Sequence, residues 1–480
     1  MKELEFFRRQ FLLSEYENFK LPWNREKILN YNLFYHPDLE FEHVANEMID
    51  LYLLGFLFDY ENPEYSNKKI LDSLKGSYSF EHFLENLTKY SGHYVIIYRS
   101  TEKFILLNDA CAQHEVYYDN LFSSFATQIK LLEKVIPIVP HSSVDAINFF
   151  SSPSFISQKI FIGETTHAEN IKHLLPNHYI DIEQKSIIRF FPKDQLKSNT
   201  INEASMEACK MLKGYIKAAS LRNKIYMAVT GGYDSRVLFL ASLDVDCKYY
   251  VSRLNNMDSR HNDIVIPQKL AKIFNKEFKV IVENPMDKKE KLKQEISIDF
   301  PRELKIPGEE YYKHILINGN ISEIARNYYG YYQNILPGEL AILYGHNGNS
   351  FVCKEYEKWL KRSSSMFSEK GYNILDMFYW EEKMGNWAAK AKTEMSAMGT
   401  IIYSPFCSHK LLTILLSTPR NHRDEYSNNL YDMIINNFSN EVSKIPINPS
   451  TKKKIILILK RFKIFNLIQI IKLKFKLLKI

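Results

Sequence analysis

The chain has 480 residues, of which 45% are hydrophobic and 25% are charged. This length exceeds one compact core, so we expect two globular domains. The five cysteines are widely spaced and include no Cys-x-x-Cys pair, which argues against disulfides and a structural zinc site and favours a reducing, cytoplasmic location. The first residues lack the uninterrupted apolar core of a signal peptide.

The net charge of +7 is unevenly distributed along the chain. Residues 452–480 contain ten Lys and Arg residues and no acidic residue, whereas the remainder has 53 basic and 56 acidic residues, a net charge of −3. A nucleic-acid-binding protein spreads its basic side chains over a folded face. Because the excess of basic over acidic residues is confined to the last segment, we expect no nucleic-acid partner.

Residues 1–190 predict a layered β structure with few long helices. Several apolar runs have the length and composition of strands, and residues 99–103, between the runs 94–98 and 104–107, predict a hairpin. The polar stretch 191–200 contains no Gly/Ser-rich tether, so it predicts a short connector to a second domain. Strands are expected at residues 51–58, 94–98, 104–107 and 117–118, and residues 171–180 are expected to form a short segment, a turn and a strand.

Residues 225–236 combine an apolar strand, a turn with two glycines and the start of a helix. The glycines allow close approach to a ligand, and the helix directs its free N–H groups and positive dipole end at the turn. Thr and Ser hydroxyls can bind phosphate oxygens, whereas an aspartate fits beside phosphate if Mg²⁺ lies between them. The turn therefore predicts a Mg²⁺-nucleotide site, with an ordinary surface turn as the alternative. Its residues are Thr230, Gly231, Gly232, Asp234 and Ser235, and Asp234 is the expected Mg²⁺ ligand.

Strands and helices alternate after this turn, which predicts a mostly parallel sheet with ligands at the carboxyl ends of its strands. Asp263, at the start of the next helix, is expected to be its N-cap. Residues 315–329 again read as a strand, an Asn-Gly turn and a helix, which suits either a second phosphate-facing turn or a locally capped turn. Strands are expected at 248–251 and 278–281, and helical segments at 263–273 and 378–387.

The turn resembles the pyrophosphate-binding Ser-Gly-Gly-x-Asp-Ser loop (PP-loop) of the N-type ATP pyrophosphatases, with Thr230 keeping the hydroxyl of the usual Ser. With the segments on its C-terminal side included, the chain is similar to the asparagine synthetase family. Residues 91–94, 108–110 and 176–179 loosely match motifs of the amidohydrolase half of that family. The resemblance implies an Ntn-hydrolase-like β-sandwich at 1–190, a PP-loop domain at 200–445 and a basic amphipathic tail at 446–480.

The resemblance also implies roles for individual residues with ATP and Mg²⁺ as cofactors. The family's catalytic base falls on Asn320, which cannot accept a proton at neutral pH, so Glu323, Tyr328 or Tyr329 would substitute. Arg326 would clamp phosphate. Val229 and Val251 are expected against adenine, the loop residues 230–235 against pyrophosphate, Asn318 and Gly319 in the second turn, and a lysine from Lys444 or Lys452 to Lys454 at the pyrophosphate.

Glutamine hydrolysis in this family uses an N-terminal cysteine, whereas this chain begins Met-Lys-Glu-Leu-Glu and its first cysteine, Cys111, reads as a small buried side chain. We therefore expect an ATP-dependent ligase that forms an amide through an acyl-adenylate and takes ammonia or a substrate amine. Its other substrate would be a small carboxylate, and the sequence leaves open whether the chain forms a homodimer. The alternatives are a nucleotide-binding pseudoenzyme or scaffold, and an amidating or cyclising enzyme of a surface polysaccharide or peptide pathway.

The tail has an apolar helical rhythm interrupted by lysines, which predicts a basic amphipathic helix too charged to span a bilayer. Two interpretations are open. The helix can lie on the inner face of a membrane with anionic lipids, or it can dock on the second domain.

Overall fold

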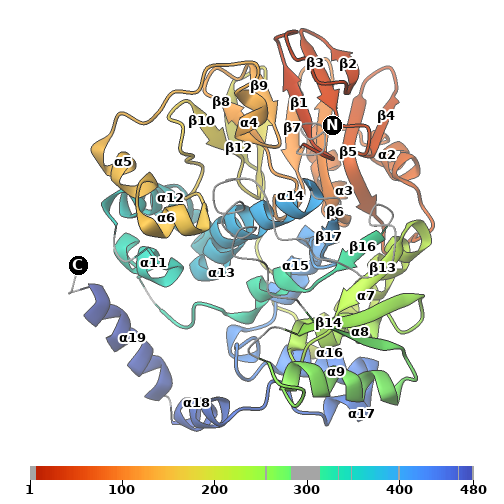
Figure 1. Ribbon diagram of the computed structural model, residues 1–480, viewed down its shortest axis with the longest axis vertical. Helices are drawn as coiled ribbons and strands as arrows, with labels where there is room; N and C mark the ends of the chain where they lie inside the picture. Colours follow the sequence, from red (N-terminus) through yellow and green to blue (C-terminus); the bar gives the residue numbers. More distant parts are fainter. Residues whose placement is uncertain are drawn as a thin grey trace.

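The computed structural model describes residues 7–253, 257–282, 314–332, 334–346, 349–397, 400–462 and 464–477. Within these ranges the chain is a mixed α/β protein with two antiparallel sheets followed by one parallel sheet (Figure 1). This order agrees with the sequence, which predicts strands first and alternating strands and helices later. The chain start without a cysteine, and Lys463 and Lys479 of the tail, lie outside the described residues.

Two antiparallel sheets form the first half. Their strand orders are β10-β8-β9-β1-β3-β2 and β12-β11-β7-β6-β5-β4. The predicted hairpin is confirmed, because β6 and β7 pair antiparallel with Arg99 opposite Phe104. The strands are β1 (Phe11–Ser14), β2 (Asn24–Ile28), β3 (Tyr31–Tyr35), β4 (Phe41–Ala45), β5 (Asp50–Phe58), β6 (Ser91–Arg99), β7 (Phe104–Asn108), β8 (Tyr117–Asp119), β9 (Ser124–Ala126), β10 (Ile171–His173), β11 (His178–Asp181) and β12 (Ser186–Arg189).

Apolar side chains pack on both faces of these sheets. Phe11 and Leu33 of one sheet meet Leu54 and Val95 of the other in the core between them. The outer face of the second sheet is covered by α2 (Asn67–Lys75) and α3 (Phe80–Leu87), and α4 (Ile129–Leu132) contributes to the core on the outer face of the first. Burial on both faces explains why β5 and β6 are continuous apolar runs rather than alternating patterns.

The second half contains a five-stranded parallel sheet in the order β15-β14-β13-β16-β17. The chain enters at the central strand β13, moves outward through β14 and β15, and returns on the other side at β16. The order therefore reverses between β13 and β16, and ligands of such sheets bind outside the carboxyl ends of the strands at this point. The strands are β13 (Lys224–Ala228), β14 (Cys247–Arg253), β15 (Phe278–Val282), β16 (His314–Ile317) and β17 (Ile401–Tyr403).

Helices surround the parallel sheet and fill the space between the halves (Figure 1). The longest, α7 (Ile201–Arg222), begins with a capping box between Thr200 and Glu203. The segment predicted as helical around residues 378–387 is a π-helix, η3 (Tyr379–Ala388). The other helices are α5 (Val144–Phe150), α6 (Pro153–Gln158), α8 (Tyr233–Ala241), α9 (Asn262–Ile273), η2 (Asn320–Arg326), α11 (Pro337–Tyr344), α12 (Ser350–Glu369), α13 (Ile374–Phe378), α14 (Ala389–Ala397), α15 (His409–Leu416), η4 (Arg420–His422), α16 (Asn429–Phe438) and α17 (Asn440–Ser443).

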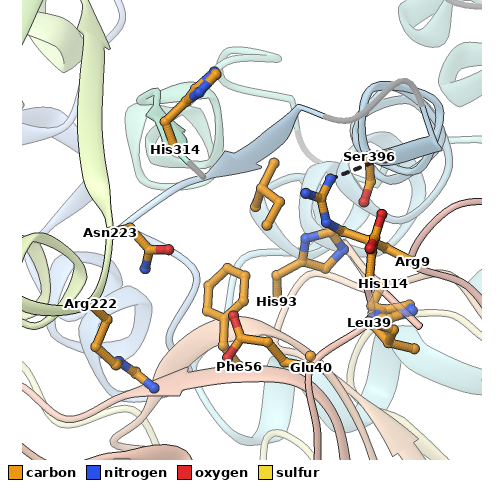
Figure 2. A pocket seen from close by; sticks show the side chains of 13 residues that line it. Arg9, Leu39, Glu40, Phe56, His93, His114, Arg222, Asn223, His314 and Ser396 are labelled. Carbon is orange, nitrogen blue, oxygen red and sulfur yellow. Dashed lines mark hydrogen bonds between the residues drawn. The ribbon is translucent and has the colours of Figure 1, made fainter. Parts of the chain in front are cut away.

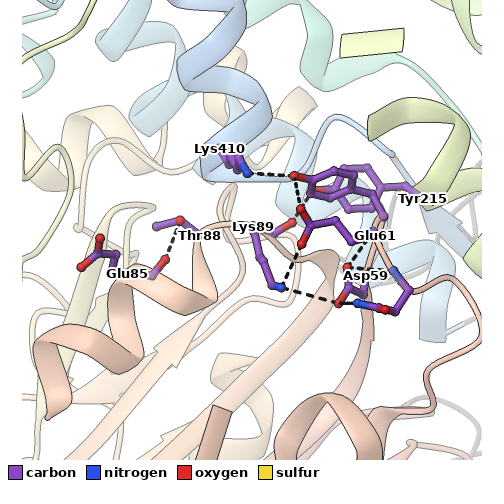
Figure 3. A network of polar contacts seen from close by, with 9 residues as sticks. Asp59, Glu61, Glu85, Thr88, Lys89, Tyr215 and Lys410 are labelled. Atoms are coloured by element: carbon purple, nitrogen blue, oxygen red, sulfur yellow. Dashed lines mark hydrogen bonds and ion pairs between the residues drawn. The ribbon is translucent and has the colours of Figure 1, made fainter. Parts of the chain in front are cut away.

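The two halves share a buried interface. Glu381 of η3 is fully buried and pairs with Arg189 of β12, while Trp359 donates a hydrogen bond to Glu381 at 2.8 Å. Burial would raise the pKa of Glu381, but Arg189 outweighs it and holds that pKa below its usual value. Figure 3 shows a second network at the junction, in which Lys89 lies 3.2 Å from Glu61.

The tail forms two helices rather than the single helix that the sequence predicts. They are α18 (Thr451–Arg461) and α19 (Ile464–Leu477), and α19 contacts α11. Ile456 and Leu473 are buried, and Lys474 lies 2.5 Å from Glu339 of α11. Across the described residues, no helix has both the length and the apolar character that a membrane crossing requires.

Candidate functional site

The turn predicted to bind phosphate connects β13 to α8 at the carboxyl edge of the parallel sheet. The hydroxyls of Thr230 and Ser235 lie 3.0 Å apart, and the N–H of Thr230 donates to Ser235 Oγ at 3.0 Å. The N-cap of α8 is Gly232, which offers no side chain to the helix N–H groups. The positive end of α8 is therefore left without a side-chain cap at this turn, as an anion site requires.

The second turn lies beside the first, because β16 pairs directly with β13. Gly319 approaches Asp234 so closely that a Cβ at Gly319 would lie 2.5 Å from the Cβ of Asp234. Ser322 donates a hydrogen bond to Asp234 Oδ1, and Arg326 lies 2.6 Å from Asp234 Oδ2. Residues almost one hundred positions apart in sequence thus meet around one carboxylate.

Arg326 is held as a cation by this arrangement. Burial would lower the pKa of its guanidinium, but the carboxylates of Asp234 and Glu323 outweigh burial and raise that pKa. A planar guanidinium at this position can bind either a carboxylate or a phosphate. Both oxygens of Asp234 therefore have protein partners, and phosphate would compete with Asp234 for Arg326.

Asp234 is the candidate Mg²⁺ ligand of this cleft. Among the residues that the structure describes, no cluster of three or more His, Cys, Asp or Glu side chains could hold a metal ion. Mg²⁺ is commonly bound by one or two carboxylates together with phosphate oxygens and water. Asp234 meets that requirement only when phosphate supplies the other ligands.

A hydrogen-bonded pair of the partly buried acid Glu323 and the buried phenol of Tyr379 lies next to Asp234. Tyr379, the first residue of η3, donates a hydrogen bond to Glu323 Oε2. Burial raises the pKa of Glu323, the hydrogen bond from Tyr379 lowers it, the charge of Asp234 raises it, and the net shift is upward. Lys383 packs 5.0 Å from the Trp387 ring centroid, and burial lowers the pKa of its ammonium. This side of the cleft can hold and exchange a proton.

The remaining predicted site residues are divided between the cleft and its walls. Asn320 is exposed on η2. Asn318 donates its backbone N–H to Tyr403 at 3.0 Å, and its side-chain oxygen is buried without a hydrogen-bond partner among the described residues. Tyr329 is buried in an aromatic wall, 5.6 Å from the Tyr379 ring centroid. Val229 and Val251 are both buried at the carboxyl ends of β13 and β14.

Sequence reasoning assigned the wrong role to Asp263. The N-cap of α9 is His261, and the carboxylate of Asp263 instead accepts the N–H of Gly231 at 2.8 Å. A short aspartate at a helix start is typical of a cap, so the local pattern could not reveal this long-range contact. Asp263 occupies one of the loop amides that phosphate would use.

The resemblance places a lysine from Lys444 or Lys452 to Lys454 at this loop without fixing which one, and it does not reveal the contact of Asn448. Asn448 donates its N–H to the carbonyl oxygen of Gly231 at 3.2 Å. Lys453, in the first turn of α18, donates to the carbonyl oxygen of Ile447 at 2.8 Å and lies 5.5 Å from the Tyr233 ring centroid. Burial lowers the pKa of Lys453, Asp432 raises it, and the nearby Arg326 and Arg236 lower it further. Of the four candidate lysines, Lys444, Lys452 and Lys454 are exposed, whereas Lys453 is half-buried beside the loop.

Two cavities lie away from this cleft, and the sequence predicted neither. One, of about 300 Å³, is bounded by the sandwich and the amino edge of the parallel sheet and is lined by His93, His114 and Arg222 (Figure 2). Burial lowers the pKa of His114 to about 3. Among the described residues no cysteine lines it. The other, of about 470 Å³, is a groove beside α3 and α15.

Comparison with known proteins gives no family assignment. No protein-family model and no curated protein matches the sequence. Among solved structures, the chain is similar to the "allosteric regulatory enzyme of purine biosynthesis", with 9% identity, a TM-score of 0.25 and coverage of 65% of this chain and 69% of that chain. It is also similar to glutamine phosphoribosylpyrophosphate amidotransferase from B. subtilis complexed with ADP and GMP, with 9% identity, a TM-score of 0.23 and coverage of 68% and 72%. Likeness at this level assigns neither fold family nor function.

Proposed function

We propose that the chain is an ATP-dependent ligase of the asparagine synthetase type, which activates a carboxylate as an acyl-adenylate and transfers it to ammonia or a substrate amine. The observation that supports this most directly is the meeting of the two turns at Asp234. The Asp234–Arg326 and Gly319 contacts lie at the reversal point of the parallel sheet, where a nucleotide-binding cleft is expected.

In this proposal the loop between β13 and α8 binds the pyrophosphate end of ATP. The hydroxyls of Thr230 and Ser235 and the helix N–H groups stabilise negative charge on the departing pyrophosphate. Arg326 and Lys453 add two cations at the same edge of the cleft. Asp234 would hold Mg²⁺, which when bound neutralises phosphate charge. None of these interactions needs a covalent bond to the protein.

Proton removal from the attacking amine would fall to Glu323 with Tyr379. Asn320 is exposed and cannot act as a base, whereas Glu323 is partly buried, hydrogen-bonded to Tyr379 and close enough to Asp234 to feel its charge. A carboxylate with a raised pKa is a better proton acceptor near neutral pH than an ordinary one. The fully buried Cys111 is in no position to hydrolyse glutamine, which supports ammonia or an amine as the nitrogen source.

One observation favours the second candidate, a nucleotide-binding scaffold. Ser322 and Arg326 already satisfy Asp234, and Asp263 occupies the N–H of Gly231. An enzyme must exchange these contacts for phosphate and Mg²⁺, whereas a scaffold can keep them.

Release of AMP and pyrophosphate from α-labelled ATP distinguishes the two candidates. The protein would be assayed with Mg²⁺, first with aspartate and ammonium and then with a cell extract. Asp234→Asn removes the charge at constant size, and Asp244→Asn is the matched control because Asp244 is exposed beyond the end of α8. A ligase forms AMP in the wild type and the control but not in Asp234→Asn. ATP binding without AMP formation in any mixture would favour the scaffold.

A further inference from the structure

The tail helices expose an apolar stripe that the rest of the described surface does not match. Of the 22 exposed large hydrophobic residues in the described ranges, seven lie between residues 455 and 475, a smaller group of four lies between residues 139 and 156, and the others are spread over the rest of the chain. The seven are between 44% and 66% exposed. Isolated exposed apolar side chains are ordinary, but a dense set on one segment marks an interaction surface. The stripe consists of Ile455 and Ile458 on α18, Phe462 at the C-cap of α18, and Ile464, Leu467, Ile471 and Phe475 on α19.

The spacing places the stripe on one face of each helix. Successive members within each helix are three or four residues apart, which is the repeat of a helical face. The opposite face of α19 is the one that contacts the protein, through Phe465, Gln469, Leu473 and Leu477. Docking of the tail therefore does not use the stripe. The two interpretations left open by the sequence are compatible, because one face docks and the other stays exposed.

Lysines flank the stripe and no acidic residue interrupts it. Lys454 precedes the first apolar residue of the stripe, while Lys472 and Lys476 follow Ile471 and Phe475. Lys472 and Lys476 are exposed, and residues 451–477 contain no Asp or Glu. Apolar side chains with adjacent lysines suit an anionic bilayer, whose acyl chains are hydrophobic and whose headgroups carry negative charge.

We propose that α18 and α19 form a peripheral binding surface for anionic membranes, with the stripe inserted among the acyl chains and the lysines at the headgroups. We infer an anionic membrane rather than a protein as the binding partner, because the charged residues along residues 451–477 are all basic and the apolar side chains form a narrow line. This inference does not depend on the proposed ligase activity, and its test contains no nucleotide.

Flotation of the full chain with vesicles tests the proposal. We expect binding to vesicles with about one third phosphatidylglycerol and none to phosphatidylcholine alone. Binding should weaken as salt rises from about 0.1 M to about 1 M, because the Debye length falls from about 10 Å to about 3 Å. Equal binding to both vesicle types, or to neither, overturns the proposal.

Two sets of variants test which residues bind. The stripe variant carries Phe462→Ser, Leu467→Ser and Phe475→Ser, and the matched control carries Leu121→Ser, Met206→Ser and Leu221→Ser, which are similarly exposed elsewhere. We expect the stripe variant to bind at least about a hundredfold more weakly and the control to bind like the wild type, since each large apolar side chain contributes about tenfold. The charge variant, with Lys454→Gln, Lys472→Gln and Lys476→Gln, should lose about fivefold for each lysine.

The remaining outcomes are also decisive. Undiminished binding by the stripe variant overturns the proposal. A dimer in size-exclusion chromatography that the stripe variant abolishes, without vesicle binding by the wild type, would assign the stripe to contact between two copies of the chain and overturn it as well. The removed side chains are exposed, so the melting temperature should not change. If the melting temperature of the stripe variant falls, the charge variant decides: loss of vesicle binding by the charge variant supports the proposal, and undiminished binding by it overturns the proposal.

Discussion

Substitutions at two glycines of the candidate cleft should differ in their effect on stability although both weaken nucleotide binding. A Cβ at Gly319 would lie 2.5 Å from the Cβ of Asp234, although two carbons in contact need about 3.5–4.0 Å. Gly319→Ala must therefore separate the two turns by about 1 Å or more, at a cost of about 1–3 kcal/mol. A Cβ at Gly232 meets nothing closer than 3.5 Å, and the cost to the N-cap of α8 is below about 1 kcal/mol.

The two substitutions should also be compared by their effect on ATP affinity. A methyl group at Gly232 occupies space at the N-terminus of α8 that a phosphate needs, so Gly232→Ala should lose at least tenfold in ATP affinity, or about 1.4 kcal/mol. We expect Gly319→Ala to lower both the melting temperature and ATP affinity, and Gly232→Ala to lower ATP affinity alone. Differential scanning fluorimetry and calorimetric titration with Mg²⁺ and ATP measure these effects. A Gly232→Ala variant that binds ATP like the wild type would refute the assignment of this turn to phosphate.

Three further predictions concern the interface, the buried acids and the tail. Arg189→Met leaves the carboxylate of Glu381 buried without its cation and should lower the free energy of unfolding by about 3–5 kcal/mol, whereas Arg362→Met, which breaks an exposed pair with Glu164, should lower it by less than about 1 kcal/mol. Chemical denaturation of both variants checks this, and equal losses of stability would contradict it. Burial raises the pKa of Glu382 to about 8, so between the unfolded-state pKa and pH 8 the folded state keeps a proton that the unfolded state loses, and stability falls as the pH rises through this range. Between pH 6 and 8 the wild type should therefore lose stability that Glu382→Gln keeps. Melting temperatures of the two proteins that change in parallel over pH 5 to 9 would count against this. Lys453→Met should weaken ATP binding at least about tenfold while Lys452→Met does not, and a titration that finds no difference would remove Lys453 from the site.

The sequence predicts the sheets well because their strands are buried on both faces. Continuous apolar runs such as residues 51–58 leave little choice of structure, and β5 extends over Asp50–Phe58. The alternation of strands and helices after residue 224 likewise predicts a parallel sheet, and the pairing of β13 with β14 and β16 confirms it. Local pattern is sufficient wherever burial repeats with the period of the element.

Local pattern is insufficient where a contact joins distant residues. Nothing around Asp263 distinguishes a helix cap from a carboxylate that reaches Gly231, thirty-two residues away in sequence. For the tail, four lysines are candidates for the pyrophosphate, but the local pattern could not single out Lys453 or reveal the contact of Asn448 with Gly231. A one-helix prediction for residues 455–480 also could not locate the break before α19, because the apolar rhythm continues on both sides of it.

The pairing of Asp234 with Arg326 connects the architecture of the cleft to its chemistry. Asp234 is the side chain on which Mg²⁺ coordination depends in the proposed function, and Arg326 is the cation proposed to contact phosphate. In the structure these two charges neutralise one another at 2.6 Å. A nucleotide with Mg²⁺ supplies one anion and one cation, so it can replace both partners without leaving either side chain with an uncompensated charge. Phosphate alone would release Arg326 and leave the carboxylate facing another anion, and Mg²⁺ alone would leave the guanidinium unpaired. The cleft should therefore bind the Mg²⁺ complex of ATP more tightly than either component, which is the selectivity that an adenylating ligase needs.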